Sequence, residues 1–292
     1  MTAAPPLRDL VAAELAEPVE PQVSAMAAAI ATQYPGAARA VLFYGSCLRE
    51  KQLDGLMLDF YLIVSSYRDA FGRGWRAFAN RVLPPNVFPF AHDGLVAKYA
   101  VLSEADFHRL NGPEAGDVSV WARFAQPSRL VWAADEAARG KAVEAVARAA
   151  PTLLGYARPM AADEAEPLDL FRRGFELTYA SELRAERKGR SGSIVDDGPE
   201  RYRRFGEAAL PLGHRPSNAA KSWRRFRRRG KVLTLARLAK ATTTYAGGVD
   251  YIAWKINRHA GTAIVIKPWQ RRWPLLAAIS LVPKLLRSGA VR

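Results

Sequence analysis

A glycine–serine pair and a single aspartate form the spacing in this sequence that most suggests chemistry. Gly45 and Ser46 follow Tyr44, and twelve residues separate Ser46 from Asp59, which lies inside an apolar segment. Nucleotidyl transfer needs backbone N–H groups that hold a triphosphate, Mg²⁺ that neutralises it and a carboxylate that binds the metal. Glycine permits close approach of the backbone to phosphate, and serine adds a hydroxyl. Because a charge in so apolar a strand is costly to bury alone, the pattern is compatible with a metal-binding role for Asp59.

The same residues also permit a simpler interpretation, in which the pair is a tight turn and Asp59 is an edge-strand carboxylate facing water. Polymerase-β-type transferases usually carry Asp-x-Asp, whereas Met57 occupies the first of these positions and Asp54 is out of register. A second metal ligand would therefore have to come from elsewhere in the chain.

The elements that would position this pair indicate a mixed α/β or α+β fold. Residues 8–34 have helical spacing with an interruption near Pro18 and Pro21. Apolar runs rich in β-favouring residues predict strands at 40–44, 56–64 and 95–102. The later chain is expected to be a helical stretch at 104–185, a Gly-rich loop at 187–193, a Pro/Gly/Ser-rich linker at 211–222 and a basic helix at 223–240.

Composition bounds the class of protein. The chain has 292 residues, 49% of them hydrophobic and 24% charged, which suits one large or two modest domains with a substantial core. The single cysteine, Cys47, excludes a disulfide framework and a cysteine-based zinc site, so a reducing compartment is expected. Residues 1–30 carry charges among alanines and do not have the pattern of a secretory signal.

The positive charge is concentrated at one end of the chain. Residues 215–292 hold eighteen Lys and Arg against one acid, Asp250, whereas residues 1–214 carry a net charge of about −2. Such asymmetry is typical of a protein with a polyanionic partner, either nucleic acid or an anionic membrane.

Two segments of this basic region favour a membrane over nucleic acid. Residues 221–231 contain seven cations and two aromatics, and we expect Trp223 and Phe226 at headgroup depth with Arg224, Arg225 and Arg228 near lipid phosphates. Residues 274–282 are apolar but too short to span a bilayer, which predicts a segment lying in the membrane surface. Its expected membrane contacts are Trp269, Arg271, Arg272, Trp273, Leu276 and Ile279. The alternative is a C-terminal helix docked on the core.

With its motifs taken in order, the chain resembles the mitochondrial-type phosphatidate cytidylyltransferases, the translocator-assembly-and-maintenance family. The matching segments are Phe-Tyr-Gly-Ser at 43–46, Leu-Asp-Phe at 58–60, Lys-Tyr-Ala-Val-Leu-Ser at 98–103, Leu-Thr-Tyr-Ala-Ser-Glu-Leu-Arg at 177–184 and Ile-Val at 194–195. The similarity covers roughly residues 40–260. It departs from the family where Ala100 replaces a glycine, where Ser181-Glu182 replaces Gly-Asp, and where residues 242–248 lack the family's Lys-Gly-x-x-Thr-Ala-Gly.

The resemblance implies a polymerase-β-like nucleotidyltransferase domain at 1–110, a helical domain at 111–260 that completes the substrate cleft, and a membrane-surface tail at 261–292. It implies that Asp59 binds Mg²⁺ and that Tyr44, Gly45 and Ser46 contact the phosphates of CTP.

The resemblance further implies that Lys98 neutralises a phosphate of CTP or phosphatidic acid; alternatively, Lys98 is an edge lysine that blunts strand pairing. Glu182 and Arg184 are candidates for a second acid and a substrate contact, or they form a solvent-facing pair.

The sequence thus predicts a peripheral, Mg²⁺-dependent enzyme on the cytoplasmic side of a membrane that makes CDP-diacylglycerol from CTP and phosphatidic acid, with no nucleic-acid partner. The alternatives are another nucleotidyltransferase that acts on RNA or a small hydroxyl acceptor, and a catalytically inactive lipid-binding protein. The oligomeric state and the basis of cytidine selectivity stay open.

Overall fold

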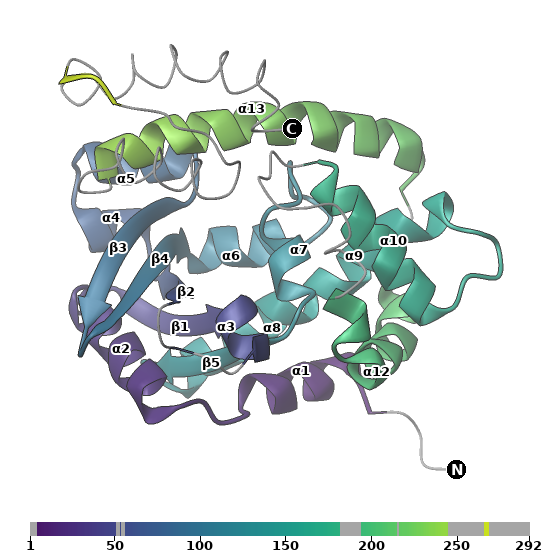
Figure 1. Cartoon of the computed structure of the whole chain (residues 1–292), viewed down its shortest axis with the longest axis horizontal. Coiled ribbons are helices and arrows are strands. Elements are labelled where there is room, and N and C mark those ends of the chain that lie inside the picture. Colours follow the sequence, from purple (N-terminus) through teal and green to yellow (C-terminus); the bar gives the residue numbers. More distant parts are fainter. Residues whose placement is uncertain are drawn as a thin grey trace.

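The chain folds into an α+β structure in which helices cover both faces of a five-stranded mixed sheet (Figure 1). The computed structural model describes residues 5–50, 53, 56–181, 194–214, 216–244 and 266–268. No helix within these ranges is long and apolar enough to cross a membrane.

The strand order of the sheet is β3-β4-β2-β1-β5, with β2 and β4 parallel and the other neighbours antiparallel. The strands are β1 Ala38–Tyr44, β2 Met57–Val64, β3 Asn86–His92, β4 Leu95–Ser103 and β5 Ser128–Ala133. The strands expected at 40–44, 56–64 and 95–102 are confirmed. The two edge strands, β3 and β5, were not predicted.

The expected helix at 8–34 is two helices, α1 Leu7–Leu15 and α2 Pro21–Thr32, since Pro21 opens the second at a position where its missing N–H is harmless. The shorter helices are α3 Ser46–Glu50, α4 Tyr67–Phe71, α5 Trp75–Val82, α6 Glu104–Asn111 and α7 Trp121–Phe124. The longer helices are α8 Glu136–Ala147, α9 Ala149–Ala157, α10 Pro167–Tyr179, α12 Pro199–Ala209 and α13 Ala219–Thr244.

Alternation along the strands divides the buried residues between the two faces of the sheet. One face, represented by Leu42, Tyr61 and Leu102, belongs to the larger core, which also takes in residues of α1, α6 to α10, α12 and α13. The other face, represented by Phe60 and Val101, packs on α2. Asp59 is in phase with Tyr61 and therefore lies on the face of the larger core.

The sheet does not end at the domain boundary expected at residue 110. Strand β5 follows that boundary and pairs with β1, with Tyr44 opposite Ser128 and Leu42 opposite Leu130. The larger core continues from β2 and α6 into α10 and α12. The segment expected to be a separate helical domain therefore supplies an edge of the sheet and shares its core.

The expected membrane contacts of Trp223 and Phe226 are wrong, because both side chains are fully buried. The indole N–H of Trp223 donates to the Tyr156 carbonyl at 2.9 Å, and both rings pack against Trp121. Residues three apart on a helix share one face, so these two aromatics turn inward together while their basic neighbours turn outward.

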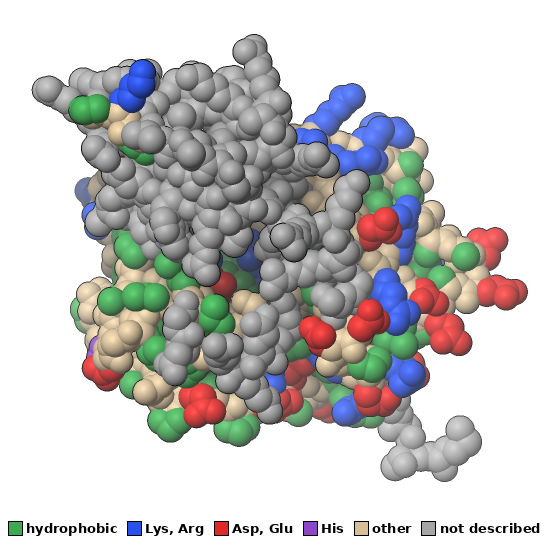
Figure 2. Space-filling view, in the orientation of Figure 1, with side chains coloured by type: hydrophobic (Ala, Val, Ile, Leu, Met, Phe, Trp, Pro, Cys, Tyr) green, Lys and Arg blue, Asp and Glu red, His purple; other side chains and the backbone are tan. Residues whose placement is uncertain are grey.

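The cations of the same segment are exposed. They are Lys221, Arg224, Arg225, Arg227, Arg228, Arg229 and Lys231. Lys and Arg side chains gather over the N-terminal half of α13 in Figure 2. None of the seven forms an ion pair with the described residues.

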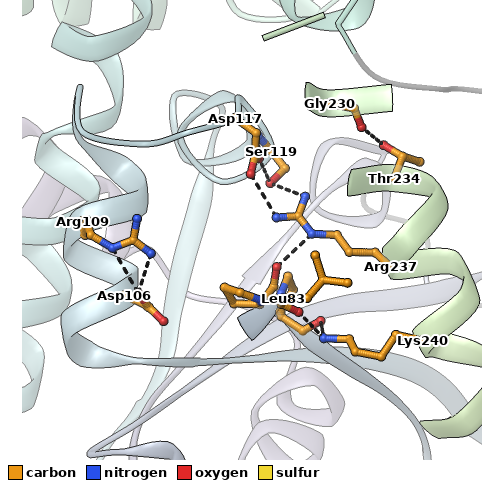
Figure 3. A network of polar contacts seen from close by, with 11 residues as sticks. Leu83, Asp106, Arg109, Asp117, Ser119, Gly230, Thr234, Arg237 and Lys240 are labelled. Atoms are coloured by element: carbon orange, nitrogen blue, oxygen red, sulfur yellow. Dashed lines mark hydrogen bonds and ion pairs between the residues drawn. The ribbon is translucent and has the colours of Figure 1, made fainter. Parts of the chain in front are cut away.

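The C-terminal half of α13 is tied to the rest of the molecule by two cations (Figure 3). The Arg237 guanidinium binds the Asp117 carboxylate and the Ser119 hydroxyl, each at 3.1 Å, and donates to the Pro84 carbonyl at 2.8 Å. Lys240 donates to the carbonyls of Leu83 and Pro85, the latter at 2.8 Å. Helix α13 is thereby fixed across the segment that joins α5 to β3.

Lys240 makes the stability of this attachment depend on pH. Burial, with Arg237 nearby, lowers the pKa of Lys240 from 10.5 to about 7. Between about pH 7 and 10.5 the unfolded chain therefore binds more protons than the folded chain, so this group adds stability as the pH rises through that window. At roughly 1.4 kcal/mol per pKa unit, the gain across the window is on the order of a few kcal/mol.

We therefore expect the stability difference between wild type and Lys240→Met to shift in favour of wild type as the pH rises from neutral. Denaturant unfolding of both proteins across the window measures this shift, and Lys221→Met, a change at an exposed lysine of the same helix, is the control. Parallel stability curves for wild type and Lys240→Met would contradict the expectation.

Candidate active site

Strand register places four polar residues in one row across the sheet. Tyr44 on β1 lies opposite Asp59 on β2 and Ser128 on β5, and Asp59 lies opposite Lys98 on β4. Paired residues on neighbouring strands project their side chains to the same face. The row therefore brings together Tyr44, Asp59 and Lys98, which the sequence selected, and Ser128, which it did not.

The turn after β1 lies directly against the Asp59 carboxylate. Gly45 has φ +99°, a conformation that residues with a side chain rarely adopt. A Cβ atom at this position would stand 3.2 Å from Oδ2 of Asp59. The backbone conformation and the close approach of the carboxylate thus both require glycine. Ser46 follows as the first residue of α3, which contacts β1 and β2.

Asp59 and Lys98 form an ion pair, with 2.8 Å between Oδ1 and Nζ. The Asp59 side chain is 20% exposed and the Lys98 side chain is 29% exposed, so a molecule from outside can reach the pair. Oδ1 is buried against the Lys98 ammonium, and an ionised carboxylate offers roughly four lone-pair sites, more than this one ion pair uses. The carboxylate therefore has acceptor capacity that a cation could use.

Arg123, from α7, adds a further cation beside this row. Its guanidinium carbon lies 5.7 Å from the centre of the Tyr44 ring. Burial and the Asp59 charge raise the pKa of Tyr44 well above its ordinary value, and Arg123 acts in the opposite direction. The Tyr44 hydroxyl thus stays protonated, and the charges of Asp59 and Arg123 have opposite effects on its pKa.

Neither Arg123 nor Ser128 was identified from the sequence. Ser128 is fully buried, and its hydroxyl has no hydrogen-bond partner among the described residues. Its place beside Tyr44 depends on β5, a strand that the sequence did not reveal. Arg123 stands in the segment Trp-Ala-Arg-Phe, and a lone cation among buried apolar residues is the signal that could have identified it.

Several predicted site residues lie outside the residues that the structure describes. Glu182 and Arg184, the candidates for a second acid and a substrate contact, are among them. So are the predicted membrane residues of the tail, namely Trp269, Arg271, Arg272, Trp273, Leu276 and Ile279.

The residues around the turn fit a Mg²⁺ ion whose ligands are mainly water and substrate phosphates. Within the described ranges, no three acidic, histidine or cysteine side chains come together as a ready metal site. Mg²⁺, however, usually retains waters and binds through one or two carboxylates together with substrate phosphates. Asp59 can meet that requirement because its ion pair with Lys98 leaves other lone pairs of the carboxylate for a cation.

A cavity of about 350 Å³ lies toward the other end of the same sheet face, and its lining includes Arg39, Glu104 and Lys141. Arg39 pairs with Glu104 at 3.2 Å and Lys141 pairs with Glu104 at 2.8 Å. The cations of this cavity pair with an acid, as Lys98 pairs with Asp59, but no glycine among the described residues lines the cavity, whereas the Gly45 turn adjoins Asp59.

A comparison of the sequence with protein-family models finds no matching family, and a comparison with curated proteins finds no match.

Proposed function

We propose that the protein is a phosphatidate cytidylyltransferase, which transfers CMP from CTP to phosphatidic acid and releases pyrophosphate. The observation that carries the proposal is the Asp59 carboxylate, which lies against the Gly45 turn and pairs with Lys98. A small-residue turn, a carboxylate with spare acceptor capacity and a lysine are the groups that a triphosphate requires.

In the proposed reaction, an ionised phosphate oxygen of phosphatidic acid attacks the α-phosphorus of CTP. The bond from this phosphorus to the oxygen that bridges it to the β-phosphorus breaks, and pyrophosphate leaves with the electron pair. The nucleophile is already anionic near neutral pH, so the site needs no strong general base. This suits the row at Asp59, in which no histidine takes part.

The chain's own groups bind and orient the triphosphate. In this proposal the backbone at Gly45 and Ser46 contacts phosphate oxygens. Lys98 turns from Asp59 to a phosphate, a movement that the partial exposure of both side chains allows. Arg123 holds the Tyr44 side chain next to the turn. Bound Mg²⁺, held by Asp59 together with the phosphates, would supply charge neutralisation.

The choice of a lipid acceptor rests on the family resemblance and on the charge of α13. Its seven exposed cations lack acidic partners among the described residues, and a cation near an anionic bilayer contributes about 1 kcal/mol to binding. This surface supports a peripheral location. The proposed role of the tail depends on the sequence alone.

Purified protein incubated with labelled CTP, Mg²⁺ and phosphatidate vesicles tests the proposal. We expect labelled CDP-diacylglycerol and pyrophosphate in equal amounts, with loss of both when Mg²⁺ is chelated. Pyrophosphate release without lipid, and without preference for CTP, would instead indicate a transferase with another acceptor. No turnover with any acceptor, together with intact lipid binding, would indicate a binding protein.

A further inference from the structure

Helix α5 exposes a row of large apolar side chains. Trp75, Phe78 and Val82 are 60%, 63% and 66% exposed, and they are among the most exposed large hydrophobic residues described. Their spacing of three and four residues places them on one side of the helix. Exposed large apolar side chains that share one side of a helix are a feature of interaction sites.

The charge around this row is of one sign. Arg73, Arg76 and Arg81 are exposed on or beside α5, and residues 72–82 contain no acid. Arg73 and Arg81 form no ion pair with the described part of the chain. An aromatic and aliphatic row flanked by arginines matches the interface of an anionic bilayer, where tryptophan and phenylalanine enter the headgroup region and arginines meet phosphates.

The opposite side of α5 is firmly attached to the sheet. Buried Asn80 donates to the Val101 carbonyl at 2.9 Å and accepts from the backbone N–H of Asn86. Asn86 in turn donates to the Arg76 carbonyl at 3.0 Å. These bonds fix the rotation of α5, so Trp75 and Phe78 are held outward and binding requires no rearrangement.

We propose that α5 is a membrane-insertion element, whose Trp75, Phe78 and Val82 enter the headgroup layer of an anionic membrane while the neighbouring arginines bind lipid phosphates. Helix α5 lies beside the C-terminal half of α13 (Figure 1), to which Lys240 connects it through the Leu83 and Pro85 carbonyls. The exposed cations of α13 lie over its N-terminal half, away from α5, and the aromatics of α13 are buried, so α5 supplies the exposed apolar side chains of this surface.

This inference deepens the proposed function by naming the surface that meets the lipid, but it is tested without catalysis. Flotation of the full chain with vesicles of phosphatidylcholine, with and without phosphatidylglycerol, measures binding in the absence of CTP. We expect the double substitution Trp75→Ser and Phe78→Ser to weaken binding to the anionic vesicles roughly tenfold or more, because both side chains lose their apolar contact.

The matched control is Leu212→Ser, a change at a leucine that is 63% exposed in a different part of the surface. This variant should bind like wild type. All the substituted side chains are exposed, so unchanged thermal midpoints should accompany the effect. Arg73→Gln with Arg81→Gln should weaken binding at low salt and flatten its salt dependence.

Unchanged vesicle binding by the double serine variant would overturn the inference. So would a change in self-association by sedimentation with vesicle binding intact, because α5 would then be a protein interface. The Asp59→Asn variant should float like wild type. If only the proposed transferase activity is wrong, no CDP-diacylglycerol forms, but the α5 substitutions still weaken flotation.

Discussion

Asp59→Asn is expected to lower kcat/KM for CMP transfer by roughly a hundredfold or more, which corresponds to at least about 2.7 kcal/mol of transition-state stabilisation. The substitution keeps the size of the side chain and removes the charge that would hold Mg²⁺ and balance Lys98. Turnover of labelled CTP with phosphatidate vesicles measures the effect. Because Asp59 is partly exposed, the free energy of unfolding should change little.

A double variant separates a catalytic carboxylate from one that only neutralises Lys98. If Asp59 serves solely as the partner of the lysine, removal of both charges in Asp59→Asn with Lys98→Met should restore function. If both residues contact the triphosphate, the double variant should be at least as inactive as Asp59→Asn. Recovery of turnover in the double variant would contradict the assigned site.

Gly45→Ala is expected to cost the next largest share of activity, about tenfold to a hundredfold. Its methyl group would stand 3.2 Å from Oδ2 of Asp59, and its φ of +99° is strained for alanine. The carboxylate or the turn must shift by a few tenths of an ångström, and small displacements at a reacting centre have large kinetic effects. Steady-state kinetics with CTP and phosphatidate measure the change.

Gly36→Ala is the matched control for Gly45→Ala. Gly36 also has a positive φ, +74°, but no atom lies within 4 Å of the position that its Cβ would take. Both variants carry backbone strain, whereas only Gly45→Ala presses on Asp59. Equal losses of activity in the two variants would mean that strain alone accounts for the effect and that the approach to Asp59 has no catalytic meaning.

The central part of the sheet could be predicted because its strands have distinct apolar runs. Both missed strands are edges of the sheet. Strand β3 contains Pro89, which weakens the strand pattern and is tolerated at an edge. Strand β5 is short and follows Pro127, inside a region whose overall spacing is helical.

Some features of the candidate site and of α13 could likewise be predicted from the sequence, and others could not. Asp59 could be predicted because a carboxylate inside an apolar strand is costly to bury, and Gly45 could be predicted because it ends the preceding apolar run. Whether the Trp223 side chain faces the core or solvent could not be predicted, because an aromatic residue among cations suits a membrane surface and a buried helix face equally well. Only tertiary packing decides between them, and here the Trp223 ring packs against Trp121 and Tyr156.

The most direct test of the central claim is calorimetric titration of CTP into the protein in the presence of Mg²⁺. The claim is that the Gly45 turn and Asp59 jointly hold a triphosphate. Wild type and Gly36→Ala should bind CTP, whereas Asp59→Asn and Gly45→Ala should bind it at least about tenfold more weakly. Equal affinity of wild type and Asp59→Asn for CTP, or no binding by wild type, would contradict the claim.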